Sequence, residues 1–445
     1  MLEALNTLLW GPGTLALILG TGAWLTLRTG GFPQRNLGRA LALSLGREAR
    51  RKGRGGVSPF GSLMTALAST VGTGNIVGVA AALVSGGPGA LVWMELAAFL
   101  GLAAKFAECM LAVKYRHVRR DGTRWGGPMA VMETRLGSAG AVLGRFYALF
   151  ALLMAFARGA MAQSGALADT FFAAFTLPRW RVGLVTAVLA LAILLGGIRR
   201  IAEISTVLVP VMALLYLGGG LAVILGNLRR LPEALILMLR CAVAPEAALG
   251  GALGIVTRRE ALRWGVARSV FSNEAGLGSA SITAACADTD EPVKQGLISM
   301  TGVFFDTMVI CTVTGLAICC SGTLGAADGN GLPLTGAALT LRAFETVLGP
   351  LAPWLIGAAL GLFAFTSVLG CAVQAETTAS YLLGPEAVRP CRVLYGLAVF
   401  VGAVIPMATV LQLADLANAL MAFSNLVCLL LLSGEIAGEC GRKER

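Results

Sequence analysis

Apolar stretches long enough to cross a bilayer recur along the whole chain, and they restrict the fold more than any other feature. Most of them are about 17 to 30 residues long, and a membrane-crossing helix needs about 20 apolar residues. Only 13% of the 445 residues are charged and 56% are hydrophobic, whereas about a quarter of a soluble domain is charged. We therefore predict an all-α integral membrane protein. About eleven runs can be distinguished, at 12–28, 60–84, 89–112, 140–175, 182–197, 202–226, 264–285, 293–321, 350–383, 391–408 and 414–434.

Glycines and polar residues interrupt two of these runs. The first interruption is 70–79, which contains Asn75, and the second is 271–280, which contains Asn273 and Glu274. Backbone cannot unwind against lipid, because each unpaired group there costs several kcal/mol, so an unwound segment must line a cavity. Paired breaks in corresponding halves of a chain indicate the binding site of a secondary transporter.

The number of runs also predicts an internal repeat. With the run 12–28 set aside as an extra N-terminal helix, ten runs remain, in a first set of five over 60–226 and a second set over 264–434. An odd number of spans in each set gives the two sets opposite orientations in the membrane. We expect a five-plus-five inverted repeat, in one transmembrane transporter domain over 1–445, with its two discontinuous helices side by side near the midplane.

Basic residues set the orientation of a membrane protein. If the N-terminus lies outside, cytoplasmic segments hold about 22 of the 35 Lys and Arg residues, chiefly within 28–54 and 114–135. We therefore expect a multi-pass protein of the plasma or inner membrane, with its C-terminus in the cytoplasm. The net charge of +11 is then explained by topology and by attraction to anionic lipid headgroups, and it does not indicate a nucleic-acid partner.

Several short motifs resemble one known family of transporters. The most specific is 271–280, which contains the sequence Ser-Asn-Glu-Ala-Gly, and 71–79 and 125–129 support it. In these residues, and over nearly its whole length, the chain resembles the alanine or glycine:cation symporters, the sodium:alanine symporter family. The resemblance implies a leucine-transporter-like fold with one extra leading helix, and sodium-coupled uptake of a small neutral amino acid.

An amino acid zwitterion needs opposite partners at its two ends. The first break can direct free N–H groups and a positive half-helix end at the carboxylate, and the second can offer carbonyl groups to the ammonium. The alternative is that these glycines only permit close helix packing. The resemblance also implies that Gln163, on the fourth run, is a residue of the substrate pocket. The predicted substrate-binding residues are Gly72, Thr73, Gly74, Asn75, Phe156, Gln163, Phe271, Ser272, Asn273, Gly276 and Cys371.

The resemblance also implies a sodium site, with sodium as the coupling ion and no other cofactor. Thr366 and Ser367 place adjacent hydroxyl groups at membrane depth. The implied ligands are these two hydroxyls and the carbonyl oxygens of Ala68, Val71 and Ala364. The alternative is that both hydroxyls bond to their own helix, as Ser and Thr commonly do.

Other interpretations remain open at this stage. The segment 371–376 departs from the family pattern, in which a tryptophan and tyrosines are typical, so a larger or more polar amino acid is an alternative substrate. Coupling to protons through Glu274, Asp306 or Glu376 is an alternative to coupling to sodium.

Lys105 and Glu108, three residues apart, can form an ion pair on one helix face. No enzyme motif was found, so we expect no enzyme, and a non-transporting sensor is disfavoured because no soluble domain is appended.

Overall fold

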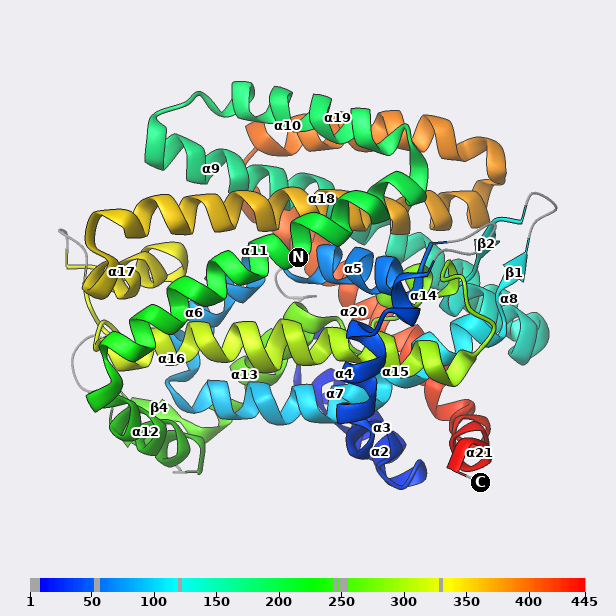
Figure 1. Cartoon of the computed structure of the whole chain (residues 1–445), viewed down its shortest axis with the longest axis horizontal. Coiled ribbons are helices and arrows are strands. Elements are labelled where there is room, and N and C mark those ends of the chain that lie inside the picture. The colour runs from blue at the N-terminus through cyan, green and yellow to red at the C-terminus, as the bar shows by residue number, and fades with distance from the viewer. Residues whose placement is uncertain are drawn as a thin grey trace.

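The computed structural model describes residues 9–51, 57–118, 122–243, 246–248, 255–327 and 331–444, and these residues are mostly helical. Within that part, seven helical segments are long and apolar enough to cross a membrane, and one bent pair would make an eighth. The long helices lie side by side and run roughly horizontally in Figure 1. The prediction of an all-α membrane protein is confirmed.

The first half of the chain begins with a helix that precedes the first break. Its α-helices are α2 (Pro12–Arg28), α3 (Phe32–Arg35), α4 (Leu37–Leu45), α5 (Pro59–Thr70), α6 (Val77–Gly86), α7 (Gly89–Lys114), α8 (Pro128–Met154), α9 (Gln163–Phe175), α10 (Arg179–Leu194), α11 (Gly197–Gly226) and α12 (Leu231–Val243). A π-helical turn, Ala155–Ala162, joins α8 to α9, and short 3₁₀ turns lie at Glu48–Arg50, Thr73–Asn75 and Leu228–Arg230.

The second half of the chain also begins with a helix that stops early. Its α-helices are α13 (Arg258–Asn273), α14 (Ser279–Ala285), α15 (Pro292–Val303), α16 (Thr312–Ser321), α17 (Gly336–Leu348), α18 (Ala352–Leu383), α19 (Val388–Val404), α20 (Met407–Leu431) and α21 (Ser433–Glu444). A second π turn, Phe304–Cys311, joins α15 to α16, and 3₁₀ turns lie at Gly349–Leu351 and Pro385–Ala387.

Strands are confined to short hairpin-like pairs in the described residues. β1 (His117–Val118) pairs antiparallel with β2 (Arg124–Trp125), and β3 (Glu246–Ala248) pairs antiparallel with β4 (Ile255–Thr257). In Figure 1, β1, β2 and α21 lie at one end of the helices, and α12, β4 and α17 lie at the other. We call the end formed by β1, β2 and α21 the tail face.

The helices follow the predicted runs, with some differences in length. The fourth predicted run starts at 140, but α8 begins at Pro128 and is kinked at Gly137, whose φ is 61°. Three helices, α2, α10 and α13, have 17, 16 and 16 residues, so they fall just below the length of a full span. The count of eleven spans and the inverted repeat therefore stay predictions.

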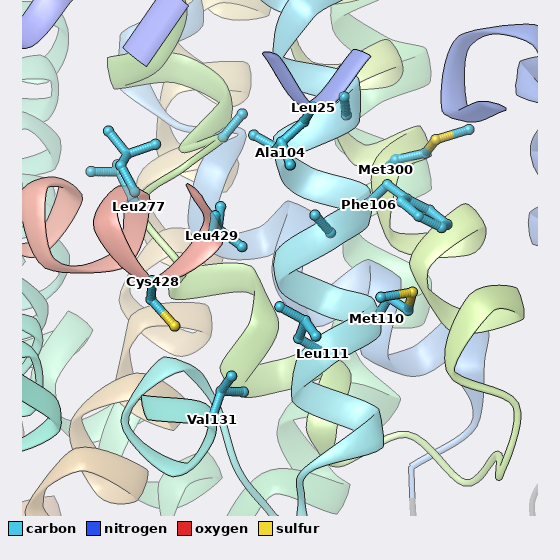
Figure 2. Packing of buried hydrophobic residues seen from close by; sticks show 14 of the residues in the cluster. Leu25, Ala104, Phe106, Met110, Leu111, Val131, Leu277, Met300, Cys428 and Leu429 are labelled. Carbon is cyan, nitrogen blue, oxygen red and sulfur yellow. The ribbon is translucent and has the colours of Figure 1, made fainter. Parts of the chain in front are cut away.

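One large buried hydrophobic cluster lies around α7. The α7 residues Ala104, Phe106, Met110 and Leu111 belong to it with Leu25 of α2 and with side chains of α15 and α20. Figure 2 shows α7 in the centre, with Leu429 and Cys428 of α20 on one side and Met300 of α15 on the other. α13 also packs along α7. This central helix carries Lys105 and Glu108, which bond to the second break.

Candidate functional site

The first predicted break is present, and a side chain of the chain itself holds it open. α5 ends at Thr70, α6 begins at Val77, and the two helices meet at an angle of 63°. The Asn75 side-chain oxygen accepts a hydrogen bond of 3.0 Å from the backbone N–H of Gly72. Asn75 is fully buried, so this turn is part of the fold and not a solvent-exposed loop.

Two backbone N–H groups in this turn make no hydrogen bond with any described residue, and we call them open. The amides of Thr73 and Gly74 have no hydrogen-bond partner within the residues that the structure describes, whereas those of Asn75 and Ile76 bond back to Gly72 and Thr73. The two open residues are partly exposed, although both of their neighbours are buried. Open amides at a helix break attract an anion, because they carry partial positive charge.

Side chains from three other helices surround the open turn. A Cβ added at Gly72 would lie 2.9 Å from the Ser367 hydroxyl of α18 and 3.6 Å from the Gln163 amide of α9. The hydroxyl of Thr73 lies 3.5 Å from the Gln163 oxygen. A Cβ added at Gly74 would lie 3.4 Å from the Phe271 ring. The structure therefore brings these predicted site residues together.

The second predicted break is also present, between α13 and α14, and it differs from the first. Glu274 has a positive φ of 53°. Its carbonyl accepts a hydrogen bond of 3.1 Å from the Lys105 ammonium of α7. The Glu108 carboxylate accepts from the N–H groups of Gly276 at 3.2 Å and Gly278 at 3.0 Å.

Two further buried side chains form hydrogen bonds with the second break. The Asn425 side chain donates to the Gly276 carbonyl at 2.9 Å, and the Tyr147 hydroxyl donates to the Leu277 carbonyl at 3.1 Å. Both backbone groups of Gly276, a predicted substrate residue, are therefore already bonded. The second break is a hydrogen-bonded wall, held by α7, α8 and α20, and the first break is the open one.

A buried ion pair ties this wall to the π turn after α8. The Arg158 guanidinium pairs with the Glu274 carboxylate, and these side chains are 4% and 0% exposed. Arg158 also donates to the Phe271 carbonyl at 2.8 Å and lies over the Phe271 ring, 4.6 Å from its centroid. The Phe271 carbonyl, expected to face the substrate, is thus occupied. The carbonyls of Ser272 and Asn273 accept no hydrogen bond within the described residues.

A polar network joins the two breaks through the π turn after α15. The Asn75 amide donates to the Ser272 hydroxyl at 3.1 Å and to the Asp306 carboxylate at 2.9 Å. Ser272 donates to the other carboxylate oxygen at 2.6 Å, and Thr307 does so at 3.1 Å. Asn273 donates to the Thr307 hydroxyl at 3.0 Å. Asn75 and Asn273 therefore meet in one network at the base of the site.

The predicted sodium ligands are only partly together. The Ser367 hydroxyl lies 3.4 Å from the Val71 carbonyl. Thr366 instead donates to its own helix, to the carbonyls of Leu362 at 2.9 Å and Phe363 at 3.1 Å. α18 touches α5 closely here, since a Cβ on Gly370 would lie 2.9 Å from the carbonyl carbon of Ala68. Ala364 is buried on the same helix.

Two further predicted residues pack beside the site. The Phe156 ring meets Tyr395 edge-on, with centroids 5.4 Å apart. Cys371 is buried against the π turn, because a Cβ on Gly159 would lie 2.2 Å from the Cys371 Cβ. Neither residue has a described contact with the open turn, so their role in substrate binding stays a prediction.

A cavity of about 290 Å³ opens at the tail face. It is lined by the second half of α18, including Val373, Glu376 and Thr377, and by segments near β2, α11 and α19. Ser367 lies about two to three turns further along α18. The cavity and the Ser367 hydroxyl are therefore carried by the same helix, with the cavity toward the tail face.

Most of the side chains that hold the second break were not among the residues predicted from the sequence. The pairing of Lys105 with Glu108 was expected and is present at 3.3 Å. The pairing of Arg158 with Glu274 was not, nor were the bonds from Asn425 and Tyr147. A charged residue at membrane depth needs a partner, so the sequence indicates that Arg158 pairs with a carboxylate. Nothing in the sequence identifies which carboxylate this is.

Comparison with known proteins gives consistent matches over the full length. The profile of the sodium:alanine symporter family matches residues 1–441. An uncharacterised transporter of Haemophilus influenzae is 43% identical over 97% of this chain and 92% of its own. The sodium/alanine symporter AgcS of Methanococcus maripaludis is 41% identical over 99% and 96%. A probable sodium/glutamine symporter, GlnT of Bacillus subtilis, is 37% identical over 96% and 87%.

Proposed function

The chain belongs to the sodium:alanine symporter family, a family of cation-coupled amino acid symporters, and from this premise we propose that it carries a small neutral amino acid such as alanine or glycine into the cell with sodium. Transport proceeds by alternating access, without covalent chemistry, in the plasma or inner membrane. The N-terminus lies outside and the tail face lies in the cytoplasm, in agreement with the distribution of basic residues.

The open amides of Thr73 and Gly74 are the observation that carries this proposal. Within the part of the chain that the structure describes these amides have no hydrogen-bond partner, and their residues are partly exposed and lie next to Gln163 and Phe271. An amino acid carboxylate fits there, because two N–H donors and the positive end of α6 favour negative charge. Gly72 and Gly74 keep side chains away from this position.

The ammonium end of the substrate then faces the end of α13. Among the described residues no donor reaches the carbonyls of Ser272 and Asn273, so both can accept hydrogen bonds from the substrate, while Arg158 donates to the carbonyl of Phe271. Because the Phe271 ring lies close to the open turn, 3.4 Å from where a Cβ on Gly74 would stand, we expect only a small side chain to be accepted there. The other predicted residues would lie around the pocket without bonding to the carboxylate or the ammonium, namely Phe156, Gly276 and Cys371.

Sodium binds between α5 and α18 in this proposal. Ser367 and the Val71 carbonyl already lie 3.4 Å apart, and the carbonyls of Ala68 and Ala364 are the further ligands. Thr366 would join by turning its hydroxyl from the carbonyls of its own helix, a change of one side-chain torsion. The tail-face cavity would then serve as the release path to the cytoplasm.

One observation favours a second candidate substrate. Gln374 lies in the segment that departs from the family pattern, is fully buried, and has no hydrogen-bond partner for either amide atom within the described residues. Since an unpaired buried amide is costly, a polar substrate side chain could satisfy it. Glutamine-like amino acids are therefore the alternative to alanine and glycine, and Gln374→Leu separates the two.

Uptake into proteoliposomes tests both candidates. The purified protein is reconstituted, an inward sodium gradient is applied, and labelled alanine, glycine and glutamine are compared with a proton gradient alone. Sodium-driven alanine or glycine uptake that survives Gln374→Leu supports the first candidate. Glutamine uptake lost in that variant supports the second, and uptake driven only by protons would refute sodium coupling.

A further inference from the structure

One arginine side chain holds the segment that follows α14 at the tail face. Arg116 lies between α7 and β1, and its side chain is only 6% exposed. Its guanidinium donates to three backbone carbonyls of this segment, those of Ala285 at 3.4 Å, Ala287 at 2.7 Å and Thr289 at 2.5 Å. It also pairs with the Asp290 carboxylate at 2.8 Å. One side chain therefore fixes this segment at four points.

These contacts matter because α14 is a very short helix. It has seven residues and begins directly after the second break, and isolated helices of fewer than about 12 residues are only marginally stable. The last carbonyls of a helix also lack partners within that helix, and a cation near them is favourable because it complements the helix dipole. Arg116 supplies both the cation and the hydrogen-bond donors at the end of α14.

The same segment is bonded to the chain before α5. Val57 and Ala287 form a parallel β-bridge, and the N–H of Asp288 donates to the Val57 carbonyl at 2.7 Å. Within α5, the Ser62 hydroxyl donates to the Thr283 carbonyl of α14 at 2.9 Å. In Figure 1, α14 lies between α5 and β2, and it contacts both of them.

Both half-helices reach the cavity at the tail face. Val57, before α5, and Cys286, after α14, line this cavity. α5 leads into the first break and α14 leads out of the second. A change in the width of the cavity therefore involves the tail-face halves of both broken helices.

We propose that Arg116 is a positioning residue for transport, which keeps α14 bonded to the chain before α5 so that the two half-helices move together when the tail-face cavity opens. The inference rests on the alternating access proposed above. The described hydrogen-bond partners of Arg116 all lie within 285–290, and none of them is a predicted substrate residue. Loss of the guanidinium therefore slows the conformational change and leaves amino acid binding intact.

Uptake kinetics in proteoliposomes separate this role from a role in binding. Arg116→Ala is expected to lower the maximal uptake rate per folded transporter about tenfold and to change KM less than about twofold. Arg116→Lys keeps the charge but loses the fork of donors, so it should restore only part of the rate. Arg135→Ala is the matched control, because Arg135 pairs with Glu435 of α21 and is 43% exposed, and it should transport at the wild-type rate. An unchanged maximal rate in Arg116→Ala, or a raised KM at that rate, would overturn the proposal.

Hydrogen exchange tests the contact without any amino acid. In nanodiscs, Arg116→Ala should raise the exchange of residues 283–290 and of residues 57–62 together, about tenfold in each, while Arg135→Ala changes neither. A rise in 283–290 alone would refute the joint movement of the two half-helices. Failure to find sodium-driven uptake would count against the proposed function, and the exchange result would still decide whether Arg116 holds the half-helices together.

A cross-link tests whether α5 and α14 stay together during transport. Val57→Cys and Ala287→Cys place two thiols at the β-bridge, and Cys286→Ala removes the neighbouring native thiol. The oxidised and reduced forms of this variant are expected to transport at the same rate. Loss of uptake on oxidation, restored by a reductant, would show that the half-helices must separate and would overturn the proposal. Failure of the thiols to link in folded protein would also contradict it, because residues that move together stay within bonding distance.

Discussion

The ion pair between Arg158 and Glu274 should behave differently from an exposed pair of the same chemistry. Among the described residues, Arg158→Met leaves the buried carboxylate charged, with the Ser279 hydroxyl as its hydrogen-bond donor, and Glu274→Gln leaves the buried guanidinium without its charged partner but with its hydrogen bond to the Phe271 carbonyl. Removing one member of a buried pair costs about 3–5 kcal/mol, whereas replacing both is often far less costly. The double variant is therefore expected to be about as stable as either single variant, or more stable.

The measurement is a double-mutant cycle on the free energy of unfolding in mixed SDS and detergent micelles. The control pair is Asp169 with Arg179, 2.5 Å apart and 45% and 47% exposed, for which a coupling of about 0.2–1 kcal/mol is expected. For Arg158 and Glu274 the expected coupling is about 3 kcal/mol. Additive single effects at the buried pair would refute the argument that it holds the second break.

Three further outcomes are expected. Asn75→Ala should abolish uptake but leave folded protein in the membrane, because its side chain holds the open turn; full uptake would refute the site. Gly72→Ala should reduce uptake at least about tenfold, since its Cβ would lie 2.9 Å from a hydroxyl on α18, whereas Gly357→Ala, whose Cβ would meet no described atom of another element within 4 Å, should not. The hydrogen bond from Lys443 lowers the pKa of Glu291, so this contact contributes stability above the carboxyl's unfolded pKa and is lost as pH falls through the lowered value. Hydrogen exchange of α21 should therefore rise as the pH falls through that range, and Lys443→Gln should remove that dependence.

Both helix breaks could be predicted because their signal is local. Glycines beside Asn75, and Asn273 beside Glu274, are incompatible with an ordinary lipid-facing helix, and the structure interrupts a helix at each place. The end of the second break was less clear. α13 continues through Asn273 and ends where Glu274 adopts a positive φ of 53°. No residue pattern in the sequence marks this as the last residue of the helix.

The partners of the breaks could not be read from the sequence. Glu108 bonds to Gly278 across 170 positions, and Asn75 meets Asp306 across 231. Such contacts depend on which helices become neighbours, and hydrophobic runs do not specify that. Thr366 illustrates the same limit, since its hydroxyl could bond to its own helix or to an ion, and both outcomes fit the same residues.

The two π turns also determine how the helices around them respond to the deletion of a single residue. A π turn is equivalent to one residue inserted into a regular helix, and each residue rotates the following side chains by about 100°. Deleting one residue within Ala155–Ala162 would straighten that helix and swing Arg158 away from Glu274, and the same change within Phe304–Cys311 would displace Asp306. Alignments of relatives should therefore allow single-residue gaps inside these two membrane helices, because an ungapped alignment would pair the wrong side chains on one side of the turn.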